Sequence, residues 1–128
     1  MQQDTTPLAN IREVAWTKDA ECRFAEVNDA FVGEFHVGQN AVAGKTDYYV
    51  FPVQLAERLL AADREVLRSG RAIRVEHRIS RNEESRWVEI VKSPLVDAAG
   101  AIVGTLAVMR ELAAPAPAAA ATQNRSDP

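Results

Sequence analysis

The chain has 128 residues, a length that suits one domain with a single hydrophobic core. It is 47% hydrophobic and 26% charged, as soluble globular proteins are, and its net charge is −3. An acidic balance argues against a surface that binds duplex nucleic acid, so we expect no nucleic-acid partner. No apolar run approaches the ~20 residues that cross a bilayer. With no signal peptide and a single cysteine, we expect a cytoplasmic protein without membrane contact or internal disulfide.

The N-terminal part of the chain predicts a β-hairpin after a short lead-in. Residues 1–10 form this lead-in, which is polar and contains a proline. Apolar and polar residues alternate over residues 13–17, a pattern typical of a half-buried strand. Residues 18–23 are polar and predict a turn, and residues 24–27 form the second strand.

Helices follow the hairpin. Asn28 stands where a helix N-cap belongs, and Phe31 and Phe35 are four residues apart, so both rings share one helical face. Gly38 is a plausible end of this short helix. A longer helix is predicted over residues 53–68, ended by Ser-Gly. Its apolar stripe comprises Leu55, Leu59, Ala62 and Val66.

The rest of the chain predicts three strands, over residues 73–79, 87–91 and 101–109. The last two are apolar on both faces, so both faces need cover. Helices can cover one face, and a lead-in helix or a second subunit the other. Two strands, a group of helices and three strands predict an α+β domain with an antiparallel sheet. The tail, residues 113–128, is rich in Ala and Pro and is expected to be disordered.

Several segments together resemble a PAS domain, over residues 11–112. They are V-N-D-A-F (27–31), G-K-T-D-Y-Y-V-F-P (44–52), L-R-S-G (67–70) and R-W-V-E-I-V-K-S-P-L-V-D-A-A-G-A-I-V-G (86–104). Each segment alone is weak evidence, but their order and spacing are those of the family. The end of the last strand, residues 109–113, departs from the Asp-Ile-Thr type ending that often leads into a signalling helix.

The resemblance implies a five-stranded antiparallel sheet in the order 2-1-5-4-3, with helices packed on one face around a cleft. PAS domains are sensory and interaction modules, and most have no catalytic activity of their own. Many bind a small molecule in the cleft, dimerise through the outer face of the sheet and regulate an effector. We therefore expect a homodimer that acts on a histidine kinase or another signalling effector.

The two histidines are weak candidates for chemistry. His36 is one position past Phe35, which turns it off the aromatic face, so we interpret it as a surface histidine. His77 has the strand parity of Val75 and is expected to face the cleft, where a structural, hydrogen-bonded role is the favoured interpretation. Haem-binding PAS domains usually take their axial ligand from the long helix, and residues 53–68 contain no histidine.

Cofactor chemistry is also disfavoured at the cysteine. In the light-sensing flavin subclass a helical cysteine beside the cleft forms the flavin adduct, whereas Cys22 lies in the predicted first turn. We expect neither haem nor a flavin adduct and no metal, and an unidentified small molecule remains open. The arginines at 71, 74, 78, 81 and 86 alternate with glutamates, which favours a solvated sheet over a basic patch.

We expect the protein to have no enzymatic activity, because the sequence has no catalytic triad motif and no phosphate-binding loop. Two alternatives stay open: a small enzyme that uses His77 with Glu89 as a general acid–base pair, and a purely structural dimerisation domain. An ion pair between Lys92 and Asp47 is a further expectation. The ligand-cleft candidates are Phe31, Phe35, Tyr48, Phe51, Leu59, Val75, His77 and Ile90. The dimer-face candidates are Val14, Trp16, Trp87, Val103 and Met109.

Overall fold

The computed structural model describes residues 7–81 and 84–113. Within these residues two strands are followed by four helical segments and then by three strands. The elements are β1 (Val14–Asp19), β2 (Phe24–Val27), α1 (Asp29–Phe35), α2 (Gln39–Val42), η1 (Asp47–Tyr49), α3 (Val53–Ser69), β3 (Ile73–Arg81), β4 (Glu84–Val96) and β5 (Ile102–Leu112). The expected tail lies outside the described residues, apart from Ala113.

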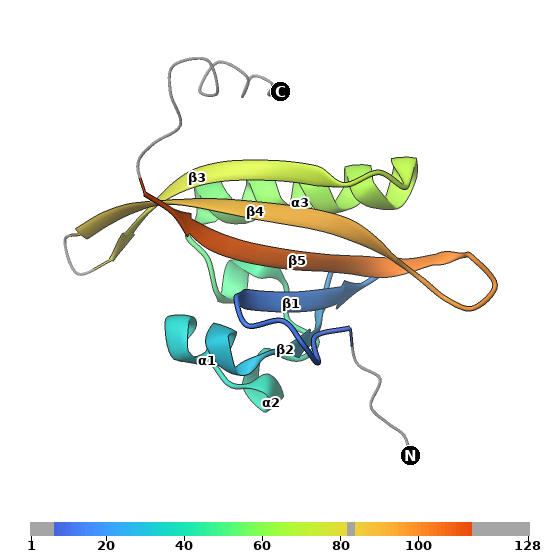
Figure 1. Ribbon diagram of the computed structural model, residues 1–128, viewed down its shortest axis with the longest axis horizontal. Helices are drawn as coiled ribbons and strands as arrows, with labels where there is room; N and C mark the ends of the chain where they lie inside the picture. Colours follow the sequence, from blue (N-terminus) through green and yellow to red (C-terminus); the bar gives the residue numbers. More distant parts are fainter. Residues whose placement is uncertain (1–6, 82–83, 114–128) are drawn as a thin grey trace.

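The five strands form one antiparallel sheet in the order β2-β1-β5-β4-β3. The long helix α3 lies along one face of this sheet, where it packs against β3, β4 and β5 (Figure 1). The α+β fold and the strand order expected from the sequence are confirmed.

The strands at the C-terminal end are longer than predicted, and so is β1. Strand β1 continues through Lys18, which had been assigned to the turn and which pairs in register with Thr105 of β5. The two strands approach closely here, because a Cβ on Gly104 would lie 2.0 Å from the carbonyl oxygen of Lys18. The polar sequence around Lys18 predicted a turn. The residue is instead buried in the strand, and its charged partners lie in other parts of the chain.

Asn28 joins three segments of the fold. Its Oδ1 accepts from the backbone N–H of Phe31 (3.0 Å), which confirms the predicted N-cap of α1, and from that of Ala15 (3.1 Å). Its Nδ2 donates to the carbonyls of Glu13 (2.8 Å) and Ile11 (3.2 Å). The helix α1 ends before Gly38, at His36, whose left-handed backbone (φ 61°) forms the C-cap.

The core between sheet and helices is built around aromatic rings. Trp16 packs against Phe31 and Phe51 with ring centroids 5.6 and 5.5 Å apart, and Phe35 lies 4.9 Å from Phe31. Rings at these separations and tilts attract one another in addition to burying apolar area. This cluster therefore joins α1 and Phe51, which follows η1, to the sheet, whereas α3 packs on it through aliphatic side chains such as Leu55 and Leu59.

Candidate functional site

Four charged side chains lie in the interior, and none has exposed surface. They are Lys18 from β1, Asp47 from η1, Asp63 from α3 and Lys92 from β4, and we refer to them as the charge cluster. Burying an ion costs several kcal/mol unless a partner and further hydrogen bonds compensate for it. Two positive and two negative charges balance one another here, so the cluster is neutral as a whole.

Asp63 is the hub of the charge cluster. Its Oδ2 accepts from Lys18 Nζ at 2.8 Å, and its Oδ1 accepts from Lys92 Nζ at 2.9 Å and from Thr105 Oγ1 at 3.0 Å. Burial by itself would raise the pKa of this carboxyl, but the charges and hydrogen bonds of the two lysines outweigh it and the pKa is lowered. Asp63 is therefore an ionised, fully bonded carboxylate.

Asp47 is less well satisfied than Asp63. Its Oδ2 forms an ion pair with the Lys18 ammonium, while its Oδ1 has no hydrogen-bonding partner among the described residues. Burial raises the pKa of Asp47, and the charges of Lys18 and Lys92 only partly oppose that effect. Burial, together with the like charge of Lys18, lowers the pKa of Lys92. Within the charge cluster, burial therefore disfavours the charged forms of Asp47 and Lys92.

The charge cluster is continuous with the aromatic core. Lys92 Nζ lies 5.5 Å from the centroid of the Trp16 ring, and Lys18 Nζ lies 5.2 Å from that of Phe24. Cations over aromatic faces gain electrostatic attraction. The indole Nε1 of Trp16 is buried and, within the described part of the chain, finds no acceptor. A buried N–H without an acceptor costs about 1–3 kcal/mol.

Sequence reasoning found only part of this site. Lys92 was expected to pair with Asp47, but its carboxylate partner is Asp63, while Asp47 pairs with Lys18. A signal was nevertheless present in the sequence. Asp63 lies four residues after Leu59, inside the apolar stripe of the helix, and Lys18 and Lys92 have the strand parity of the core residues Trp16 and Ile90.

The ligand-cleft candidates fall into two groups. Phe31, Phe51, Leu59, Val75 and Ile90 are buried in the core cluster, and Phe35 packs against it while partly exposed. Tyr48 is 50% exposed and so lies outside the core. The structure thus places most of the candidates around the interior, but they fill it with side chains.

His77 faces the helix side of the sheet, as its parity predicted, and is half-buried against Arg58 of α3. Arg58 Nη1 donates to His77 Nδ1 at 2.7 Å and to the carbonyl of Glu76 at 2.9 Å. Burial, and then the arginine charge, lowers the pKa of His77. Glu89 lies on the opposite face, bound by Arg74 and Arg110, so the suggested His77–Glu89 acid–base pair is wrong.

The dimer-face candidates are divided between the two faces of the sheet. Trp16 and Met109 belong to the core cluster and Val14 packs against it, so these three do not lie on the outer face. Trp87 alternates with buried Val88 and has the outer-face parity of Glu89. Val103 is 46% exposed. Strands with apolar residues at both parities gave no means of telling the two faces apart.

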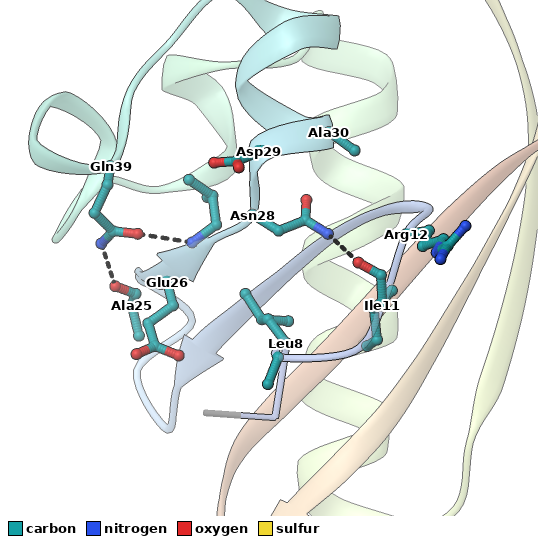
Figure 2. A pocket seen from close by; sticks show the side chains of 11 residues that line it. Leu8, Ile11, Arg12, Ala25, Glu26, Asn28, Asp29, Ala30 and Gln39 are labelled. Atoms are coloured by element: carbon teal, nitrogen blue, oxygen red, sulfur yellow. Dashed lines mark hydrogen bonds between the residues drawn. The ribbon is translucent and has the colours of Figure 1, made fainter. Parts of the chain in front are cut away.

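A groove of about 770 Å³ lies on the surface between the lead-in and the β2–α1 junction (Figure 2). Its main polar side chains are engaged within the protein. Gln39 accepts from the Val27 N–H at 2.8 Å and donates to the Ala25 carbonyl at 2.7 Å, and Asn28 makes the four bonds described above. Gln39 thus forms hydrogen bonds with the backbone at the edge of β2, as a neighbouring strand would. We therefore interpret the groove as a structural feature that joins these segments, not as a ligand site.

The remaining candidates show no chemistry. His36 is exposed at the end of α1, and Cys22 is buried in the β1–β2 turn with a left-handed backbone. No group of His, Cys, Asp and Glu among the described residues could hold a metal ion. In the same part of the chain no helix has the length and apolar character to cross a membrane. Arg74 binds both Glu76 and Glu89, which agrees with the solvated-sheet interpretation of the arginines.

Comparison with known proteins identifies the fold. The family model described as PAS fold matches residues 8–116. Solved structures of VqmA from Vibrio cholerae, one a complex with ligand and DNA, are similar; that complex has a TM-score of 0.73 at 19% identity, over 91% of this chain and 54% of VqmA. The PAS domain of Bordetella pertussis BvgS has a TM-score of 0.65 at 21% identity, over 90% of this chain and 85% of that domain. No curated protein sequence matches the chain.

These neighbours correct one expectation. The net charge of the chain had been taken to exclude a nucleic-acid partner. A further structure of VqmA, 21% identical to this chain, is that of the dimer without its target DNA and is described in terms of DNA binding by LuxR-type receptors. The chain spans about half the length of the VqmA chains. The net charge of one domain therefore does not decide whether a protein that contains it contacts DNA. The expectation that there is no nucleic-acid partner was wrong.

Proposed function

The chain belongs to the PAS fold family, and on that premise we propose that it is a sensory module that binds a small molecule between its sheet and its helices. The module has no catalytic activity of its own and passes the binding event to a signalling effector. The observation that carries this proposal is the buried charge cluster, with Asp47 Oδ1 and Trp16 Nε1 unpartnered beside it among the described residues.

A requirement for stability alone does not explain the charge cluster. Replacing buried ion pairs by apolar residues of similar volume is often neutral or stabilising. Buried polar atoms almost always have partners, so each exception calls for an explanation. A polar ligand that bonds to these atoms would supply the missing partners and would explain why charges occupy an otherwise apolar interior.

The proposal includes a homodimer that contacts its partner copy through the outer face of the sheet, around Trp87. Half-buried apolar side chains occupy this face on β4 and β5, among them Val91 and Val108, which are cross-strand neighbours. The effector is a histidine kinase or a DNA-binding regulator, in the same polypeptide or in a partner protein. The similarity to VqmA, a structure described in terms of DNA binding by LuxR-type receptors, supports the DNA-binding alternative.

A second candidate is a purely structural dimerisation domain, favoured by the close packing of the aromatic core. Mass spectrometry of freshly purified protein, under native and then denaturing conditions, separates the two functions. For a sensor we expect a small molecule that is bound in the native spectrum and released on denaturation. Trp16→Phe removes the buried N–H and should lose the bound mass, while Trp87→Phe, on the outer face, should retain it.

The opposite result is equally clear. If native spectra of wild-type protein from freshly lysed cells show only the mass of the chain, and a broad metabolite panel leaves its melting temperature unchanged, the sensor proposal fails. A stable dimer under those conditions would then favour the structural role.

A further inference from the structure

We infer that β3 is an interaction edge, which pairs antiparallel with β3 of a second copy of this chain. The contact extends the five-stranded sheet across two protomers. It is separate from the proposed dimer interface on the outer face of β4 and β5, and at high concentration it joins two such dimers. Three features of the described residues lead to it: the backbone at the edge, the side chains of β3 and one arginine that covers part of the edge.

The two edges of the sheet differ in how far their backbone groups are already used. At β2, the N–H and the carbonyl of Phe24 bond to the backbone of residues 44–45, both at 2.8 Å. Further along β2, Gln39 bonds to the Val27 N–H and the Ala25 carbonyl. The chain itself therefore closes the β2 edge, and the place for an added strand is β3, at the other margin of the sheet (Figure 1).

Every second residue of β3 directs its N–H and its carbonyl to the free edge. Arg58 of α3 donates to the Glu76 carbonyl at 2.9 Å through a solvent-exposed bond, so Glu76 is one of these residues. The alternation gives the same direction to Arg74, Arg78 and Ser80. Among the described residues, none bonds to the edge-facing backbone groups of Arg74 and Arg78.

The register of the whole sheet gives Glu76 the same direction. Ala15 bonds towards β2 through both its N–H and its carbonyl. Following the alternation through the paired positions of β5 and β4 directs Glu89 to β5. Its partner on β3, Glu76, is therefore left facing the free edge.

One register pairs the whole of β3 with its copy. An antiparallel pair about a two-fold axis overlaps all nine residues only when it is centred on His77, the fifth residue of the strand. In this register Glu76 of each copy lies opposite Arg78 of the other, and opposite charges in such positions stabilise a strand pair. On the helix side of the sheet, Val75 of each copy lies opposite Ile79 of the other, which pairs apolar side chains.

The neighbouring registers fit less well. Centring the pair on Glu76 places Arg74 opposite Arg78, and centring it on Arg78 places the two copies of that arginine opposite each other. Like charges in directly opposite positions are destabilising. Centring one position further in either direction leaves only residues 73–77 or 77–81 paired.

Arg58 competes with the second copy for the edge. In the register centred on His77, the Glu76 carbonyl accepts from the Arg78 N–H of the second copy, in the place that the Arg58 guanidinium occupies. Arg58 also bonds to His77 Nδ1 at 2.7 Å, which holds it at the edge. Charged side chains on a free edge limit edge pairing. The contact is therefore weaker than the outer-face interface and depends on concentration.

Disulfide trapping tests the register, with Cys22→Ser in every variant to remove the buried cysteine. Residue 74 lies opposite residue 80 of the second copy, with about 5.5 Å between Cα atoms, a separation that a disulfide spans. Residue 74 lies roughly 20 Å along the strand from its own counterpart. A mixture of Arg74→Cys and Ser80→Cys chains should therefore form a mixed disulfide on mild oxidation, whereas either variant alone should stay reduced. Both positions are exposed.

A second variant makes the test independent of that pair. His77→Cys lies opposite itself on the two-fold axis, with about 4.5 Å between Cα atoms, so it should link to its own copy without mixing. Two outcomes would overturn the edge pairing. One is a mixture of the 74 and 80 variants that crosslinks no more than each variant alone, and the other is His77→Cys that stays reduced at high micromolar concentration.

The roles of the side chains are tested by the association constant from sedimentation velocity. Arg58→Ala frees both Glu76 carbonyls and should strengthen the association about 10-fold. Glu76→Arg or Arg78→Glu alone should weaken it, because each places like charges opposite one another, and the double charge reversal should restore it. An unchanged constant in Arg58→Ala, or a double variant as weak as the single ones, would contradict the register.

The edge pairing and the proposed function fail separately. Val108→Glu places a charge on the outer face, so it should abolish the proposed dimer and leave the mixed disulfide between residues 74 and 80 intact. Loss of that disulfide in Val108→Glu would show that the edge does not pair by itself. If no variant crosslinks while native mass spectrometry finds a bound small molecule, the sensory proposal stands and the edge pairing falls.

Discussion

Lys92 Nζ donates to Asp63 Oδ1 across 2.9 Å, between two side chains that have no exposed surface. The bond joins the middle of β4 to α3, residues 29 positions apart in the sequence. Lys18 of β1 and Thr105 of β5 donate to the same carboxylate. One carboxylate thus ties the long helix to three strands of the sheet, and several predictions depend on it.

Removal of the hub carboxylate should strongly destabilise the protein. Asp63→Leu leaves Lys18 and Lys92 opposed only by Asp47, and an uncompensated buried charge costs about 3–5 kcal/mol. Urea unfolding followed by far-UV circular dichroism measures the free energy of unfolding. Glu65→Ala, on the exposed side of the same helix, should leave the midpoint unchanged. A loss below about 1 kcal/mol for Asp63→Leu would show that water compensates the lysines.

A charge-balanced double substitution should be much milder. Lys18→Met with Asp47→Leu removes one ion of each sign and leaves the Lys92–Asp63 pair intact. We expect the double variant to be more stable than either single variant, with a coupling of about 1–3 kcal/mol in a double-mutant cycle. Additive losses would mean that the two side chains do not compensate each other, contrary to the ion pair between them.

Acidification should weaken the contact between α3 and β3 through His77. Its pKa is lowered from 6.5 in the folded protein, so below pH 6.5 the unfolded chain binds more protons than the folded one. Stability should therefore fall as the pH drops from about 6.5 towards the lower folded pKa. His77→Gln can still accept from Arg58 and does not titrate, so its stability should depend less on pH in this range.

Asn28→Asp should loosen the lead-in without uncapping α1. The carboxylate can still accept from the N–H groups of Phe31 and Ala15, but it cannot donate to the carbonyls of Ile11 and Glu13. Amide hydrogen exchange should rise over residues 7–13 and stay unchanged in α1. Asn28→Ala removes the cap as well and should cost about 1 kcal/mol more. Equal protection of the lead-in in all three proteins would contradict this role.

The outer face of the sheet should govern self-association. A charge at Trp87 would be buried between two copies, so Trp87→Glu should shift the protein from dimer to monomer in light scattering. Tyr48→Glu, at a half-exposed position in η1, is the control and should not change the molar mass. A wild-type protein that is monomeric at high micromolar concentration would rule out this interface.

Local sequence signals predicted much of the fold. The capping side chain of Asn28 accepts from the third residue after it, and Gly70 ends α3 with a positive φ of 74°, both as expected. Such signals are reliable because a cap or a helix stop depends on residues within one turn of each other. The predicted strand order came from the resemblance of ordered motifs to a known family, and the register of the sheet agrees with it.

The sequence thus determined the order of the elements, the N-cap of α1 and the end of α3, and its resemblance to a family determined the sheet order. Only the tertiary structure decided which buried charges pair with one another and which face of β4 and β5 is inside. Lys18 looked like part of a solvated turn, and Asp63 and Lys92 gave no sign of being partners, because each finds its counter-ion 29 to 45 residues away. A charge can be buried only where folding brings an opposite charge to it, and that pairing is a property of the assembled core.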